Sequence, residues 1–174
     1  LKNNLGKSHS AYYLMSQLGG NARKQGRKQE ALDWFAQAYD KSEGPATRLQ
    51  WGASYFTALV ELAPQDAATI EKTAASLINE AAKQQGAFYE RSARSLQRVG
   101  SKLAEWNGKG EHQAAVGRLR AQLSPVCAKL PAEGGHSFRV PLPGCLERVT
   151  DPRSLTVTIA WFSPVRAGHQ SYRC

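Results

Sequence analysis

Four basic residues of this 174-residue chain are spaced three, four and four positions apart: Arg91, Arg94, Arg98 and Lys102. Residues at this spacing lie on the same side of an α-helix. A basic stripe of this kind predicts a surface for a phosphate backbone, with binding that weakens steeply as salt rises. The aromatic residues Phe88 and Trp106 fall on the apolar side of the same predicted helix, so no base-stacking platform accompanies the charge. An ordinary solvated basic surface is the alternative.

Few other residues have the types and spacing that catalysis or metal binding requires. The sequence has no glycine-rich phosphate loop and no Gly-x-Ser-x-Gly motif, and Glu105 and Glu111 are best explained as surface charges at helix ends. The cysteines and histidines are scattered, without the spacing of a zinc or thiol-redox motif: Cys127, Cys145, Cys174, His9, His112, His136 and His169. We therefore predict a protein that is not an enzyme and needs no metal or cofactor. The odd cysteine count leaves the redox state of the three thiols open.

The positive charge is concentrated in the first three quarters of the chain. The formal net charge is +9, and residues 1–131 hold 18 Lys and Arg against 11 Asp and Glu, whereas the remainder holds 5 against 3. An excess of this size allows nucleic acid, anionic lipid or acidic protein partners. No segment approaches the ~18 to 20 consecutive apolar residues of a membrane-spanning helix. We expect no membrane span.

The periodicity of the apolar residues changes once along the chain, near Pro131. Before it the sequence reads as paired amphipathic helices, and after it as isolated strands. We predict a mainly α protein with about six helices in antiparallel pairs in a domain of residues 1–131. Residues 132–174 are expected to form a short β-strand appendage, too short for a complete domain.

The first two predicted helices meet at Gly26, which tolerates the positive φ of a tight turn. Their sequence resembles one tetratricopeptide repeat, at about residues 12–45. The residues that carry the resemblance are Leu18, Gly19, Gly26, Ala31, Phe35, Ala38 and Pro45. In such a pair the small residues let the two helices approach closely, and Phe35 fills the space between them.

The remaining helices follow a less regular pattern. A second unit begins with Trp51 and Gly52, but the later repeat residues do not follow in register. We expect this helix to stop at Leu62, before Pro64, and the next to start from an Asp66 N-cap and end near Gly86. Two more helices are predicted, one from about Phe88 to Trp106 and one that Pro125 should end or kink.

The repeat resemblance implies a binding surface on the first helix. Repeats of this family bind peptides in a concave groove lined by the first helix of each pair. The positions that match its groove residues are Tyr13, Ser16, Gly20, Arg23 and Lys24. Arg23 and Lys24 could clamp a carboxylate, so the resemblance implies an acidic or C-terminal peptide ligand. The alternative is that both cations are solvated surface residues.

Residues 12–132, approximately, also resemble the helical C-terminal extension of certain bacterial thioredoxin-family proteins. The resemblance lies in four runs, at residues 44–55 (GPATRLQWGASY), 61–67 (ELAPQDA), 88–98 (FYERSARSLQR) and 126–132 (VCAKLPA). It implies a location in the bacterial periplasm or cell envelope. The Cys-x-x-Cys motif of the thioredoxin domain does not occur in this chain, so no redox activity is implied.

Residues 136–173 resemble the C-terminal β-domain of some bacterial subtilisin-like serine proteases. The similar runs are SLTVTIAWFSPV at residues 154–165 and HQSYR at 169–173. In the first run Leu155, Val157 and Ile159 alternate with threonines, as in a half-buried strand. Neither His136 nor His169 lies in a triad motif, and the catalytic domain of the family has no counterpart here.

Two partial resemblances joined near residue 132 favour a truncated or chimeric chain, and a natural fusion is the alternative. We predict a helical protein–protein interaction module that binds acidic peptide segments. The alternatives are an accessory region of a subtilisin-like protease and a basic nucleic-acid-binding helical domain.

Overall fold

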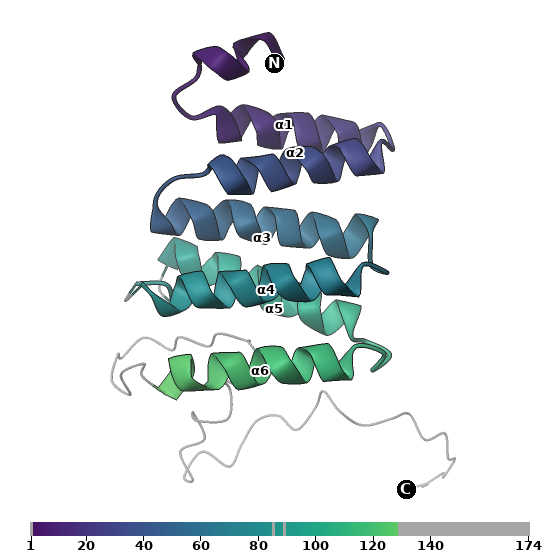
Figure 1. Ribbon diagram of the computed structural model, residues 1–174, viewed down its shortest axis with the longest axis vertical. Coiled ribbons are helices and arrows are strands. Elements are labelled where there is room, and N and C mark those ends of the chain that lie inside the picture. Colours follow the sequence, from purple (N-terminus) through teal and green to yellow (C-terminus); the bar gives the residue numbers. More distant parts are fainter. Residues whose placement is uncertain (1, 85, 89, 129–174) are drawn as a thin grey trace, which may run out of the picture.

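The computed structural model describes residues 2–84, 86–88 and 90–128, and these are almost entirely helical (Figure 1). The mainly α class is therefore confirmed for the described residues, which contain no strand. The predicted boundary near residue 131 and the expected strands of residues 132–174 lie outside them. The helices are the 3₁₀ helix η1 (Lys2–Lys7) and the α-helices α1 (Ala11–Lys24), α2 (Lys28–Lys41), α3 (Pro45–Leu62), α4 (Ala67–Ala82), α5 (Glu90–Trp106) and α6 (Gln113–Ala128).

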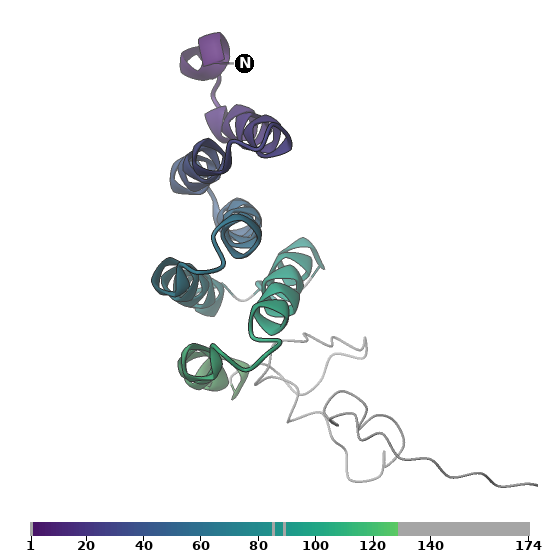
Figure 2. The same cartoon turned by 90° about the vertical axis from the view of Figure 1, so that its right-hand side faces the viewer.

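The six α-helices of the described residues form two rows. Consecutive helices run in opposite directions (Figure 1), and seen from the side they alternate between a row of α1, α3 and α5 and a row of α2, α4 and α6 (Figure 2). Helix α3 packs against α2, α4 and α5, and α4 also packs against α6. Helix α3 is thus at the centre of the stack. Its Phe56 and Leu49 are almost completely buried.

Glycine permits two of the tight connections between helices. Gly26 has φ 73° between α1 and α2, and the next backbone N–H, of Arg27, donates to the Ala22 carbonyl at 2.9 Å. The predicted turn at Gly26 is confirmed. Gly44 has φ 81° and precedes Pro45, which is the first residue of α3. Proline is well tolerated there, because the first N–H of a helix has no intrahelical acceptor.

The contact between α1 and α2 depends on a glycine. A Cβ built on Gly19 would lie 3.2 Å from ring atoms of Phe35, which is buried, as are Ala31 and Ala38. A Cβ at this position would require the Phe35 ring to shift by a few tenths of an ångström, so glycine allows the closer approach of α1 to the ring. The packing predicted for these residues is present in the structure.

Two predicted helix ends differ from the structure. Helix α4 ends at Ala82, earlier than the predicted end near Gly86. Of the two outcomes predicted for Pro125, an end or a kink of the helix, the end is wrong, because α6 continues to Ala128. Proline removes a single N–H donor, and this loss falls in the last turn of α6, where it interrupts only one intrahelical hydrogen bond.

Asp66 caps the start of α4, as the sequence predicted. Its Oδ1 accepts a hydrogen bond from the backbone N–H of Thr69 at 3.1 Å. Hydrogen bonds from Thr69 lower the pKa of the Asp66 carboxyl. The side chain of Thr69 has the larger effect and its backbone N–H the smaller one. A carboxylate at this position also interacts favourably with the helix dipole.

Asp66→Ala is expected to lower the melting temperature modestly at neutral pH, because α4 loses its cap. The pKa of Asp66 is lowered in the folded protein, so its contribution is present at neutral pH and is lost as the pH falls through that lowered pKa. Asp66→Asn keeps the cap and removes this titration. Thermal unfolding followed by circular dichroism at several pH values measures both effects, and equal melting temperatures for wild type and Asp66→Ala would contradict them.

Candidate functional site

The residues expected to line a groove lie on α1, in the row of α1, α3 and α5. Among the described residues, Tyr13 is a large hydrophobic side chain that is exposed to solvent, at 48%. Arg23 and Lys24 are exposed in the last turn of the helix, whereas Ser16 and Gly20 are partly buried. The helix therefore presents an aromatic side chain near its start and two cations at its end.

A chain of ion pairs joins the last turns of α1 and α3 to the C-terminal part of α5. The central residue is Glu61 of α3. Its Oε2 accepts a hydrogen bond from Arg23 Nη1 of α1 at 3.2 Å, and its Oε1 pairs with Lys102 Nζ of α5 at 3.1 Å. Lys102 also pairs with Glu105 Oε2 at 2.8 Å. The two basic sites that the sequence predicted separately are thus connected by Glu61, a residue whose role the spacing of the cations does not indicate.

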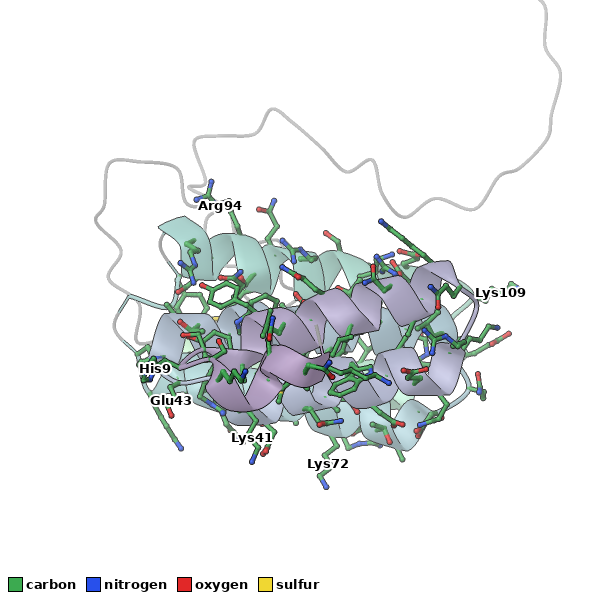
Figure 3. All side chains as sticks on the ribbon, turned by 90° about the horizontal axis from the view of Figure 1, so that it is seen from above. His9, Lys41, Glu43, Lys72, Arg94 and Lys109 are labelled. Atoms are coloured by element: carbon green, nitrogen blue, oxygen red, sulfur yellow. The ribbon has the colours of Figure 1, made fainter. Side chains whose placement is uncertain are left out.

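These ion pairs divide the predicted basic stripe on α5. Hydrogen bonds to two carboxylates raise the pKa of Lys102, the one to Glu105 more than the one to Glu61. The side chain of Lys102 is only 23% exposed. The guanidinium groups of Arg91, Arg94 and Arg98 are exposed and have no ion pair or hydrogen bond in the described part of the chain. Figure 3 shows Arg94 projecting from one side of the molecule and Lys72, on α4, from the opposite side. We call Arg91, Arg94 and Arg98 the open arginines.

An aromatic cluster lies between α1 and α3. The ring centroids of Tyr12 and Tyr13 are 4.9 Å apart, and the Tyr13 ring meets Trp51 edge-on at 5.3 Å. Trp51 is buried, and its Nε1 has no hydrogen-bond partner among the described residues. Phe88 and Trp106 are buried as well, in agreement with the prediction that they do not accompany the basic stripe.

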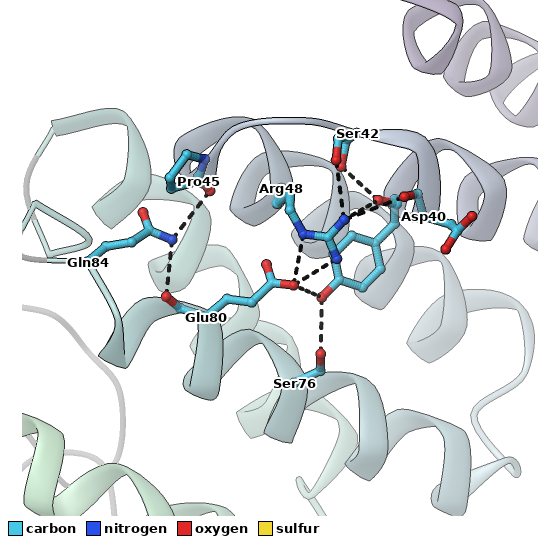
Figure 4. Close-up of polar contacts among 8 residues, drawn as sticks. Asp40, Ser42, Pro45, Arg48, Ser76, Glu80 and Gln84 are labelled. Atoms are coloured by element: carbon cyan, nitrogen blue, oxygen red, sulfur yellow. Dashed lines mark hydrogen bonds and ion pairs between the residues drawn. The ribbon is translucent and has the colours of Figure 1, made fainter.

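A second polar cluster fixes α3 against α2 and α4. Arg48 donates to Glu80 Oε1 through Nη2 at 2.8 Å and through Nε at 3.1 Å (Figure 4). The hydroxyl of Tyr39 donates to the same oxygen at 2.9 Å and is 3.2 Å from Ser76 Oγ. Burial, supported by the negative charge of Glu80, raises the pKa of Tyr39, so the hydroxyl remains a donor at neutral pH.

This cluster holds the fold together. Arg48 Nη1 also donates to the backbone carbonyls of Tyr39 at 3.3 Å and Ser42 at 3.2 Å. Although partial burial opposes it, the hydrogen bonds and negative charge of Glu80 raise the pKa of Arg48. Nearly all of its hydrogen-bonding capacity is used inside the protein, so it is not available to a partner.

The histidine next to α6 is in a structural contact. The imidazole of His112 stacks on the indole of Trp106, with 3.7 Å between the ring centroids and 4° between the planes. Trp106 Nε1 donates to the Pro64 carbonyl at 2.9 Å, which ties the end of α5 to the loop before α4. Within residues 2–84, 86–88 and 90–128, no three His, Cys, Asp or Glu side chains are grouped in a way that could hold a metal ion.

In the part of the chain that the structure describes, no helix combines the length and apolar character needed to cross a membrane.

No protein-family model, curated protein or solved structure matches this chain. The expected relation to thioredoxin-family extensions therefore stays a prediction. The segment that resembles a subtilisin-like protease lies outside the described residues.

Proposed function

We propose that the helical part of this protein is a non-catalytic interaction module that binds an acidic peptide segment along α5. We further propose that its first four helices pair as tetratricopeptide repeats do, with α1 and α2, and α3 and α4, as two units, on which α5 and α6 pack. The alternation of the helices between two rows supports this pairing (Figure 2). The row of α1, α3 and α5 is then the binding side.

One observation carries the proposal: three arginines on one face of α5 are exposed and have no acidic partner in the described residues. Three other exposed arginines, Arg23, Arg27 and Arg118, are paired with carboxylates. Unpaired arginines at helical spacing leave a row of positive charge available to a partner. Arginine is well suited to this role, because its planar group binds a carboxylate through two hydrogen bonds.

The spacing of the open arginines indicates the length of the ligand. Arg91 and Arg98 are seven residues apart, which corresponds to about 10 Å along a helix that rises ~1.5 Å per residue. An extended peptide covers this distance with about three residues, at ~3.3 Å each. Two carboxylates three positions apart in such a segment are separated by about this distance.

The aromatic residues favour a peptide over a nucleic acid. Proteins that bind single strands combine positive charge with exposed aromatic rings on which the bases stack. The sequence predicted Phe88 and Trp106 on the apolar side of the α5 region. Their side chains are 3% and 8% exposed. They are not available for stacking beside the open arginines.

The proposal is tested with a fluorescein-labelled peptide of six glutamates and fluorescence anisotropy. We expect Arg94→Ala/Arg98→Ala to bind about tenfold more weakly than wild type, because two contacts of opposite charge are lost. The matched control is Lys72→Ala/Lys109→Ala, which removes the same charge from exposed positions away from Arg94 (Figure 3).

The control should change the affinity by less than twofold at physiological salt, where charges farther apart than ~8 Å are largely screened. Equal losses in the two double variants would show that only net charge matters and would contradict the proposal. A labelled single-stranded oligonucleotide is titrated in parallel. If it binds more tightly than the peptide, and Arg94→Ala/Arg98→Ala abolishes that binding, the surface is a nucleic-acid site instead.

A further inference from the structure

Glu61 is placed as a bound carboxylate would be. Its two oxygens pair with cations from two different helices, Oε2 with Arg23 of α1 at 3.2 Å and Oε1 with Lys102 of α5 at 3.1 Å. Arg23 is 38 positions from Glu61 in the sequence. The tertiary fold, not the local sequence, therefore brings the two cations to one carboxylate.

We propose that Arg23 and Lys102 form a second carboxylate-binding site and that Glu61 occupies it as an internal competitor of the acidic partner. The proposal rests on the function proposed above, because it concerns the end of the same surface. Lys102 continues the stripe of the open arginines by one helical turn. While Glu61 pairs with both cations, a short acidic partner contacts only the open arginines. A longer partner has a further acidic side chain, which replaces Glu61 between Arg23 and Lys102.

The exposure of these residues makes such an exchange feasible. The side chains of Arg23, Glu61 and Lys102 are 44%, 35% and 23% exposed. Ion pairs at this exposure contribute little to stability, because water already screens the charges. An external carboxylate that is held nearby by the open arginines has a high effective concentration and can compete with the internal one.

Two features of the chain support a site rather than a single ion pair. Lys24 follows Arg23 and is exposed without an ion pair in the described residues, so the end of α1 holds more positive charge than Glu61 offsets. Glu105 is the second acid on Lys102 and does not pair with Arg23. The competing carboxylate is therefore expected to be Glu61, which alone contacts both cations.

The test uses the full chain with Glu61→Gln and the labelled peptide of six glutamates. Glutamine has nearly the same shape but no charge, so Arg23 and Lys102 become available to the peptide. We expect Glu61→Gln to bind about threefold to tenfold more tightly than wild type. Adding Arg23→Ala should cancel this gain.

Glu43→Gln is the matched control, because it makes the same change in net charge at an exposed residue between α2 and α3, at the other end of α3 from Glu61 (Figure 3). We expect it to change the affinity by less than twofold. If Glu61→Gln gains no more than this control, or if its gain survives Arg23→Ala, the competing site is overturned.

The same titrations separate this inference from the function on which it rests. If Arg94→Ala/Arg98→Ala weakens binding while Glu61→Gln has no effect, the acidic-peptide function stands and the Glu61 site falls. If neither wild type nor Glu61→Gln binds the peptide, both fall. Circular dichroism confirms that each variant keeps the helical content of wild type before it is titrated.

Discussion

Replacing Glu80 with alanine is expected to lower the free energy of unfolding by about 3 kcal/mol, because it removes one partner of a partly buried, hydrogen-bonded ion pair. Glu80 Oε1 accepts from Arg48 Nη2 at 2.8 Å and from the Tyr39 hydroxyl at 2.9 Å. The side chain of Glu80 is 19% exposed. Alanine would leave a guanidinium and a phenol without their acceptor between α2, α3 and α4.

The matched control is Glu71→Ala, in the same helix. Glu71 pairs with Arg118 Nε at 2.6 Å, but Arg118 is 64% exposed, so its guanidinium can be hydrated when the carboxylate is removed. Urea unfolding followed by circular dichroism measures both variants. Similar losses in the two would mean that the Arg48–Glu80 cluster does not hold the three helices together.

Gly52→Ala is expected to lower the free energy of unfolding by about 2 kcal/mol, although alanine is the better helix former by about 1 kcal/mol. The added Cβ would lie 2.4 Å from Leu77 Cδ2 and 2.9 Å from Tyr39 Cε2. Leu77 is 1% exposed, and hydrogen bonds to Ser76 and Glu80 hold Tyr39. Neither side chain can move away without disturbing the core.

Gly117→Ala provides a control of opposite sign. Gly117 lies inside α6, and a Cβ built there would meet no atom within 4 Å. This substitution should raise the free energy of unfolding by about 0.5–1 kcal/mol, through helix propensity alone. The same urea titration applies. If both substitutions were stabilising, close packing at Gly52 would not be the reason for the glycine there.

The local features of the fold were predictable because neighbouring residues determine them. The turn at Gly26 needs a positive φ, and the cap at Asp66 needs a short polar side chain three residues before a free N–H. Both signals are visible in a few consecutive residues. The end of α3 at Leu62 is of the same kind, because Pro64 follows two residues later.

The polar clusters were not predictable, because they join residues far apart in the sequence. Arg48 and Glu80 are 32 positions apart, and Gln122 donates to the Ala75 carbonyl from 47 positions away. A hydrophobic pattern shows which face of a helix is buried, but not where one helix ends relative to another. Glu61 meets Arg23 and Lys102 only because α1, α3 and α5 end on the same side of the molecule (Figure 1).

The structure changes how the predicted site residues are interpreted. Arg23 was expected to clamp a ligand carboxylate together with Lys24, but Glu61 already pairs with it. In the predicted stripe Lys102 is likewise paired, whereas Arg91, Arg94 and Arg98 are open in the described part of the chain. The spacing of four cations indicated a common face. Only the fold could show which of them have acidic partners.

Chemical-shift mapping by ¹H–¹⁵N nuclear magnetic resonance tests the proposed acidic-peptide surface most directly. The full chain, labelled with ¹⁵N, is titrated with the unlabelled peptide of six glutamates. The proposed function predicts that the largest shifts cluster on α5 around Arg91, Arg94 and Arg98 and diminish as salt is added. Shifts that cluster on α4 around Lys72, or that are spread evenly over all exposed cations, would contradict it.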